Sequence, residues 1–278
     1  MRAKATPLAG SLQWQPHVTT IDPLRRFSAR ARAYAAARPT YPPALAALLR
    51  DELGLAPRAP IADVGSGTGK LTALLLDAGY RAFGVEPNAE MRAYAEGALA
   101  DNPSFVSVGG TAQATTLPPA SVDAVTAAQA FHWFDPEKAR AEWERIVRPG
   151  GWAILVWNLR RERATPFMAA YDDLILRFAT DMRLAKAERA DEEAMLVLYR
   201  GRNWEHRMFG HVHPMDLEAL RARVTSSSFM PNDGEARFGE MLGAIDEIFA
   251  THARHGRVEF EYDTPVFFGR LNKGTVPP

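Results

Sequence analysis

The stretch Ile61-Ala62-Asp63-Val64-Gly65-Ser66-Gly67-Thr68-Gly69-Lys70-Leu71 decides the fold that this sequence predicts. A short apolar run ends in an acid and passes into three alternating glycines, and an apolar pattern with helical spacing follows at once. We interpret it as a β-strand, a tight loop and an α-helix. Glycines leave no Cβ between the main chain and a ligand, and such a loop at the tip of a parallel strand is where doubly wound sheets bind small molecules.

The spacing of the glycines argues against two phosphate-binding motifs. The dinucleotide fingerprint requires a glycine three positions after its second one, where this chain has Lys70. The phosphate loop of nucleotide triphosphatases requires Gly-Lys-Ser/Thr after a four-residue gap, which residues 65–72 lack. The acid Asp63 would repel a pyrophosphate, whereas it can order the loop and accept a hydrogen bond from a cationic ligand group.

The string Asp63-Val64-Gly65-Ser66-Gly67-Thr68-Gly69 resembles the first motif of class I S-adenosylmethionine-dependent methyltransferases. Tyr34-x3-Arg38-Pro39-x-Tyr41-Pro42 resembles a string that precedes this motif in many small-molecule methyltransferases. Gln129-Ala130-Phe131-His132-Trp133-Phe134 resembles a segment of a subgroup that includes trans-aconitate methyltransferases. The resemblance runs from about residue 27 to 160 and implies S-adenosylmethionine as the cofactor.

The composition narrows the class of protein. The 278 residues suffice for one large α/β domain with an insertion or for two small domains. The 33 lysines and arginines balance the 33 aspartates and glutamates, so no net charge draws the chain to nucleic acid or to a membrane. The sequence has no cysteine, which excludes disulfides and thiolate chemistry. No apolar run has the length of a signal peptide or a membrane span, and we expect a cytoplasmic location.

Candidate cofactor contacts follow the predicted strands. Glu86 stands about twenty residues past the glycines, at the tip of a strand over residues 81–85, where a carboxylate can accept hydrogen bonds from both ribose hydroxyls. Tyr34 and Arg38 are one turn apart on a predicted helix, either over the amino-acid end of the cofactor or on an ordinary helix surface. Pro87 and Met91 form a possible apolar wall for the adenine, although Met91 fits the core equally well.

One segment departs from the family pattern. The family usually has an acid for the adenine amino group where this chain has Thr111-Ala112-Gln113, so one of the two polar side chains is expected to accept that hydrogen bond. The resemblance implies that the glycine loop binds the methionyl part of the cofactor. The expected cofactor-binding residues are Tyr34, Arg38, Asp63, Gly65, Ser66, Gly67, Thr68, Gly69, Glu86, Pro87, Met91, Thr111, Ala112, Gln113 and Gln129.

His132 is the candidate catalytic residue, because it stands directly after a buried strand predicted over residues 122–128. It can lock its loop through a backbone hydrogen bond, or it can act as a general base toward the methyl acceptor. A carboxylate acceptor needs no base, whereas a phenol or a carbon acid does. No metal is expected at His206, His211 and His213, since no ligand cluster accompanies them; the last two are expected on the wet face of a strand.

The expected fold class is α/β: a doubly wound Rossmann-like sheet with a reversed C-terminal β-hairpin and a helical lid insertion. The expected division is an N-terminal arm (1–22), the cofactor-binding core (23–160), the helical lid (161–203) and a C-terminal part that completes the sheet (204–278). Residues 258–262 alternate between apolar and charged, which predicts an antiparallel edge strand. The lid would close over the acceptor.

These patterns predict a methyltransferase that acts on a small molecule by direct displacement of the methyl group from S-adenosylmethionine. The acceptor would be a carboxylate, a phenol or a similar group. The alternative is a protein that binds S-adenosylmethionine as a regulator or partner without methyl transfer, and a nicotinamide-dependent oxidoreductase is a distant third. The expected partners are a small-molecule substrate and a possible second copy of the chain, with no nucleic acid and no membrane.

Overall fold

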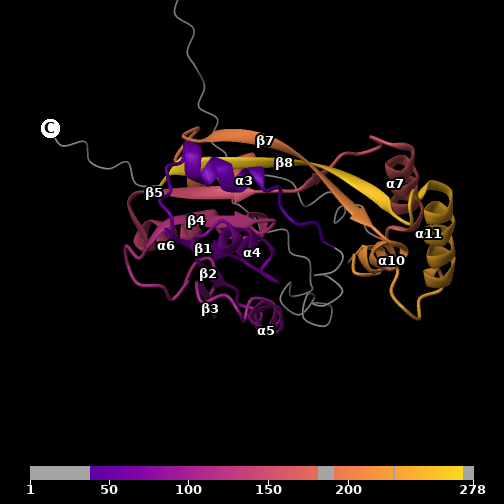
Figure 1. Cartoon of the computed structure of the whole chain (residues 1–278), viewed down its shortest axis with the longest axis horizontal. Coiled ribbons are helices and arrows are strands. Elements are labelled where there is room, and N and C mark those ends of the chain that lie inside the picture. Colours follow the sequence, from indigo (N-terminus) through magenta and orange to yellow (C-terminus); the bar gives the residue numbers. More distant parts are fainter. Residues whose placement is uncertain (1–37, 181–190, 228, 272–278) are drawn as a thin grey trace, which may run out of the picture.

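A mixed sheet of eight strands forms the centre of the structure, in the order β3-β2-β1-β4-β5-β8-β6, with β7 paired to β8 (Figure 1). The computed structural model describes residues 38–180, 191–227 and 229–271. The strands are β1 (Pro60–Val64), β2 (Arg81–Val85), β3 (Phe105–Val108), β4 (Val122–Ala128), β5 (Val147–Val156), β6 (Leu159–Arg160), β7 (Glu205–Met215) and β8 (Val258–Arg270). The helices are α3 (Ala44–Ala47), its π-helical continuation η1 (Leu48–Glu52), α4 (Lys70–Asp77), α5 (Ala89–Ala98), the short η2 (Phe131–Trp133), α6 (Pro136–Ile146), α7 (Pro166–Phe178), α9 (Glu192–Leu198), α10 (Leu217–Thr225) and α11 (Phe238–His252).

Five parallel strands, β1 to β5, confirm the doubly wound α/β fold. The chain moves outward from β1 to β2 and β3 and then returns to place β4 on the other side of β1. The connections after β1 and β4 therefore leave the sheet in opposite directions. Ligands of such sheets bind at this switch point, outside the carboxyl ends of the strands.

Helices cover both faces of the sheet, since the strands are apolar on both sides. On one face Leu49 of η1 and Leu75 of α4 pack against Ile61 of β1, and all three are fully buried. On the other face Trp143 of α6 and Leu198 of α9 complete a second core. Asparagine and aspartate caps begin α5 and α6: Asn88 accepts from two backbone amides and Asp135 from one.

The reversed C-terminal hairpin is confirmed, because β8 runs antiparallel to β5 and to β7. Residues 258–262 form an antiparallel strand with one wet face, as predicted, and β7 pairs with β8 from Glu205↔Phe268 to Met215↔Val258. On the other side of this segment, within the described residues, only Tyr262 has a strand partner, Arg160 of β6. β7 and β8 are also long enough to extend well past the parallel sheet, since the end of β5 at Val156 meets Val266.

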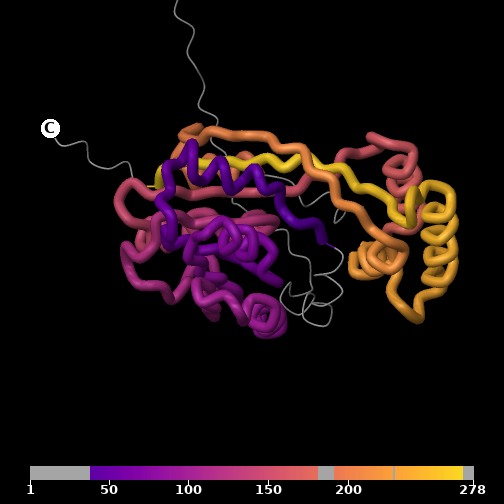
Figure 2. Tube along the Cα trace, in the orientation of Figure 1, coloured from indigo at the N-terminus to yellow at the C-terminus, as the bar shows by residue number. Residues whose placement is uncertain are grey.

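A third apolar core lies at the far end of this hairpin, and we call it the cap. It contains α7, α10, α11 and the Val258–Tyr262 half of β8, with fully buried Met168, Phe178 and Phe260. Figures 1 and 2 show α7, α10 and α11 gathered beyond the carboxyl ends of the parallel strands, apart from the helices that cover the sheet. The cap therefore faces the switch point.

The expected lid segment, residues 161–203, divides between two parts of the molecule. Its first helix, α7, packs in the cap, while α9 packs against α6 on the sheet. The expected arm over residues 1–22 and the predicted helix up to residue 37 lie outside the described residues. No helix in the ranges that the structure describes is long and apolar enough to cross a membrane.

Candidate active site

A cavity opens at the switch point, where β1, β2 and β4 end. Its wall is formed by segments that follow these strands, by the start of α4 and by the chain just before α3. The lining residues are Arg38, Pro39, Tyr41, Asp63, Gly65, Ser66, Gly67, Thr68, Lys70, Leu71, Glu86, Pro87, Asn88, Met91, Ala128, Gln129, Ala130, His132, Trp133, Phe134 and Asn158.

The glycines of the loop after β1 serve different steric needs. All three have positive φ, with 71° at Gly65, 56° at Gly67 and 81° at Gly69. A Cβ on Gly65 would lie 2.7 Å from the Cβ of Ala130, whereas a Cβ on Gly67 would meet no atom within 4 Å. Gly65 therefore permits the segment after β4 to approach the loop, and Gly67 leaves its backbone open to the cavity.

Glu86 is joined to this loop. One carboxylate oxygen accepts from the Gly67 N–H at 3.0 Å, and the other accepts from the Asn88 N–H at 2.9 Å. The carboxyl group is 7% exposed, and burial raises its pKa although both hydrogen bonds oppose that shift. A carboxylate has about four lone-pair directions, so Glu86 can accept further hydrogen bonds from a ligand in the cavity.

Asp63 lies at the end of β1 and is 1% exposed. Its carboxylate accepts from the hydroxyl of Thr72 on α4 at 2.6 Å and from that of Thr126 on β4 at 3.0 Å. Burial raises the pKa of Asp63 to about 6, against the effect of these hydrogen bonds. The acid thus fixes the helix and the two strands that flank the glycine loop, and it presents partial or full negative charge at neutral pH.

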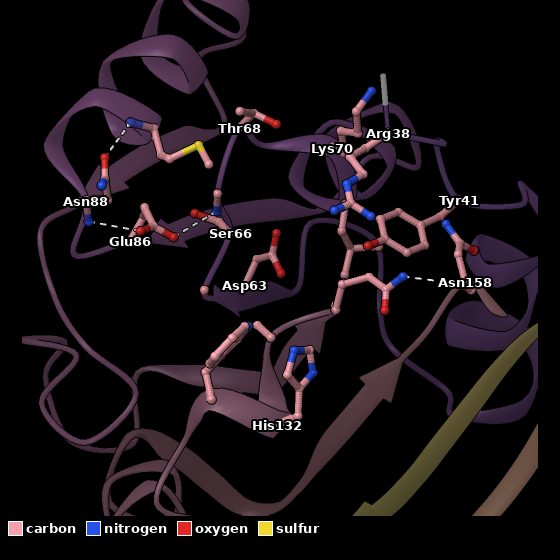
Figure 3. A pocket seen from close by; sticks show the side chains of 18 of the residues that line it. Arg38, Tyr41, Asp63, Ser66, Thr68, Lys70, Glu86, Asn88, His132 and Asn158 are labelled. Atoms are coloured by element: carbon pink, nitrogen blue, oxygen red, sulfur yellow. Dashed lines mark hydrogen bonds between the residues drawn. The ribbon is translucent and has the colours of Figure 1, made fainter. Parts of the chain in front are cut away.

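Positive groups occupy the other end of the cavity. Figure 3 shows Arg38, Lys70 and Tyr41 together on one side, Glu86 and Asn88 on the other, and Asp63 between them. Burial lowers the pKa of the Lys70 ammonium group. A ligand with a carboxylate at one end and neutral hydroxyls at the other matches this separation of charge.

The segment after β4 forms the remaining wall. Gln129 has φ 54°, a backbone conformation uncommon outside glycine. Its side-chain N–H donates to the Asn158 carbonyl at 3.1 Å, while its buried Oε1 has no hydrogen-bond partner in the structure. His132 lies across the cavity from the glycine loop (Figure 3), with its ring 4.9 Å from that of Trp133.

The structure brings most of the expected site residues to this cavity. The lining includes Arg38, Asp63, Gly65, Ser66, Gly67, Thr68, Glu86, Pro87, Met91, Gln129 and His132. Gly69 starts α4 beside it. Thr111, Ala112 and Gln113 are not among the lining residues; Ala112 is buried in the sheet core and the Thr111 hydroxyl accepts from Ala114. Tyr34 lies outside the described residues.

Sequence reasoning missed several lining residues, notably Lys70, Asn88 and Asn158. Asn158 links distant segments: its amide donates to the Thr40 carbonyl at 3.0 Å and its Oδ1 accepts from the buried Thr264 hydroxyl at 2.7 Å. Its position directly after the fifth parallel strand was the available signal. Tyr41 also lines the cavity, and it belongs to the string that the sequence analysis quoted around Arg38.

The histidines of β7 lie differently from the prediction. His211 and His213 pair with Tyr262 and Phe260 and are half-buried, so their expected place on a wet face was wrong; the exposed face carries His206, Met208 and Val212. α10 contacts β7, and the buried and exposed faces of the strand are exchanged relative to the prediction. Within the described residues no group of three or more potential metal ligands occurs.

Comparison with known proteins gives consistent similarities. Residues 62–155 match the family model described as "Methyltransferase domain". An uncharacterized methyltransferase-like protein of Schizosaccharomyces pombe is 31% identical over 235 residues, 83% of this chain and 88% of that protein. An uncharacterized methyltransferase of Mycobacterium tuberculosis is 43% identical over 137 residues, 49% of this chain and 54% of the relative. The chain thus spans about half the length of this mycobacterial relative.

Among solved structures, a putative type II methyltransferase from Anaeromyxobacter dehalogenans is similar, with a TM-score of 0.59 and 25% identity over 84% of this chain and 98% of the other. A putative methyltransferase from an antibiotic biosynthesis pathway of Anabaena variabilis shares the fold, with a TM-score of 0.55 and 20% identity over 83% of this chain and 98% of the other. Both similarities cover more of this chain than residues 62–155.

Proposed function

Because the chain belongs to the class I S-adenosylmethionine-dependent methyltransferases, we propose that it transfers a methyl group from S-adenosylmethionine to a small-molecule acceptor by direct displacement. S-adenosylmethionine supplies a methyl group on an electrophilic sulfonium. The protein then needs to align acceptor and methyl group and to exclude water, without a covalent intermediate.

The main observation behind this proposal is the hydrogen bond that joins Glu86 to the glycine loop. The Gly67 N–H bonded to Glu86 and the open space over Gly67 place a carboxylate beside an accessible backbone. We assign Glu86 to the two ribose hydroxyls, the loop from Gly65 to Gly69 to the methionyl part, and Asp63 with Arg38 to its charged amino-acid end. Pro87 and Met91 would flank the adenine.

Titration of the cofactor tests this assignment. S-adenosylmethionine and S-adenosylhomocysteine are titrated calorimetrically into the wild type, Glu86→Gln and Glu142→Gln, with the reduced nicotinamide dinucleotide as a control ligand. Loss of hydrogen bonds to a charged acceptor should weaken cofactor binding by Glu86→Gln at least about tenfold. Glu142 is a matched control, because it is also buried and accepts from a backbone amide, that of Thr115, but it does not line the cavity.

No binding of S-adenosylmethionine to the wild type would contradict the proposal, and equal losses in both variants would remove the role of Glu86. Methyl transfer from labelled S-adenosylmethionine to a panel of carboxylates and phenols separates an enzyme from the alternative, a protein that binds the cofactor without turnover. Binding without transfer to any acceptor would favour that alternative.

His132 is the proposed catalytic residue if the acceptor must lose a proton. A histidine must be neutral to act as a general base, so the rate should fall at acid pH. The His132→Asn variant should then lose most of kcat together with this limb of the pH profile. A profile of unchanged shape with a lower kcat would assign His132 to holding the loop after β4 instead.

A further inference from the structure

Positive charge gathers between the cofactor cavity and the cap. Arg38 and Lys70 line the cavity, while Arg160 and Arg223 belong to the chain leading into α7 and to α10. The whole sequence has equal numbers of acidic and basic residues, so this concentration does not follow from a basic composition. Cations that are partly buried close together would stabilise an anion bound among them.

Arg223 reaches this place from the cap. Its guanidinium carbon lies 4.6 Å from the centre of the Phe260 ring and 5.7 Å from that of Tyr262. The charges of Arg223, Arg38 and Arg160 all act to lower the pKa of the Tyr262 hydroxyl, but burial dominates and raises this pKa. The charges of three guanidinium groups from three separate segments therefore act on one phenol.

The same place contains buried polar atoms without partners. Tyr262 is 2% exposed and its hydroxyl has no hydrogen-bond partner in the structure, and the same holds for the buried Nε2 of His211, whose ring is 6.3 Å from that of Tyr262. Gln129 contributes a third such atom, Oε1, on the cavity wall. Unpaired buried polar groups are costly, and a polar ligand would satisfy them.

His213 connects the cap side with the cavity side. Burial lowers its pKa to about 4, with further lowering by the charges of Arg223 and Lys70. The imidazole is therefore neutral at physiological pH and remains able to donate one hydrogen bond. Arg160, the cation of this group that lies before α7, forms an ion pair with Asp172.

We propose that Lys70, Arg223 and the Tyr262 hydroxyl form a subsite for an anionic group of the methyl acceptor, so that the substrate is an organic carboxylate or phosphate. This inference rests on the proposed function, because the anion would belong to the molecule that accepts the methyl group. The cap binds the anion, and the rest of the acceptor extends toward His132 and the cofactor. Guanidinium groups suit both anions through paired hydrogen bonds.

The test uses the full-length chain saturated with S-adenosylhomocysteine, into which citrate and inorganic phosphate are titrated separately. The wild type should bind at least one of them, and the preferred anion separates a carboxylate from a phosphate substrate. Arg223→Gln should weaken this binding about tenfold or more, because a hydrogen bond to a charged group is lost. Tyr262→Phe, which keeps the ring and its packing, should weaken it about three- to tenfold.

Arg221→Gln is the matched control, since Arg221 lies on the same helix but is exposed and paired with Asp246. It should leave anion binding unchanged. Titration of S-adenosylhomocysteine alone into each variant reports the cofactor site separately, so a failure of the proposed function is recognised before anion binding is measured. If the loaded wild type binds neither anion, or if Arg221→Gln and Arg223→Gln lose affinity equally, the subsite does not exist.

Discussion

At the scale of single residues, the glycine loop shows why one residue type recurs for different reasons. Gly65 lacks a side chain because Ala130 and Phe134 approach it, and their atoms would lie 2.7 and 3.1 Å from a Cβ there. Gly67 has no such neighbour within 4 Å. Gly67 must be a glycine because its φ is positive and because a side chain there would occupy the space of a ligand in the cavity.

The Gly67→Ala variant tests this distinction against Gly54→Ala. Gly54 also has a positive φ, 67°, with no atom within 4 Å of an added Cβ, but it lies at the end of η1 and does not line the cavity. Both variants should lose about 1–2 kcal/mol of unfolding free energy, because alanine is strained in the left-handed region. Only Gly67→Ala should also weaken S-adenosylhomocysteine binding, by about tenfold, since its methyl group enters the ligand space.

Urea denaturation and calorimetry measure the two effects separately. Unchanged binding by Gly67→Ala, with the expected loss of stability, would show that the cofactor does not contact this backbone. The glycine would then serve the turn alone.

At the scale of elements, Asp63 holds β1, α4 and β4 in register around the loop. The carboxylate accepts the Thr72 and Thr126 hydroxyl hydrogens, yet burial still raises its pKa to about 6. An unfolded chain would have this aspartate near its ordinary pKa of about 3.9. The folded state therefore binds the proton more tightly than the unfolded state.

This difference predicts a pH dependence of stability. The contribution of Asp63 is greatest below about pH 4 and is lost as the pH rises through about 6, because the buried group must then ionise. A shift of about two units corresponds to about 3 kcal/mol. The unfolding free energy of the wild type, measured relative to Asp63→Asn, should therefore decrease by up to this amount between pH 4 and pH 8. A difference that stays constant or rises with pH would mean that the group is ionised and well solvated.

The elements around the site were predictable because local signals agree there. The glycines that follow an apolar run and the acid that follows the second strand are each recognised within a few residues of sequence, so Asp63 and Glu86 could be placed from the chain itself. The opposite held for contacts between distant segments. The burial of His211 depends on packing across the long hairpin and α10, and nothing near it in the sequence carries that information.

The same limit explains two further differences. Thr111 and Gln113 were placed by analogy with the family position, but the turn after β3 directs Ala112 into the sheet core, and neither polar residue is among the cavity lining. The division of residues 161–203 between cap and sheet depends on which core each apolar face meets. The apolar pattern shows which face of a helix is buried, but it does not show against which core that face packs.

At the scale of the whole molecule, the cap and the sheet have separate apolar cores joined by β7 and β8. The Phe178 side chain is 1% exposed within the cap, and Trp143 is fully buried under the sheet on α6. The cofactor cavity is lined by residues of the sheet and its loops, while the cap supplies Arg223 and Tyr262 to the proposed anion subsite. Cap stability should therefore affect acceptor binding more than cofactor binding.

The Phe178→Ala variant tests this separation, with Trp143→Ala as its counterpart in the sheet core. Loss of a large buried ring costs about 3–5 kcal/mol, and an opening confined to the cap should speed amide hydrogen exchange in α7, α10 and α11 about a hundredfold or more. In Phe178→Ala, amides of β1 and β4 should keep their protection and S-adenosylhomocysteine should still bind. Trp143→Ala should expose β4 and weaken that binding, because α6 supports the wall that carries His132. Equal acceleration of exchange in cap and sheet by Phe178→Ala would show instead that the long hairpin couples them into one cooperative unit, in which case the cap could not open to admit an acceptor while the cofactor stays bound.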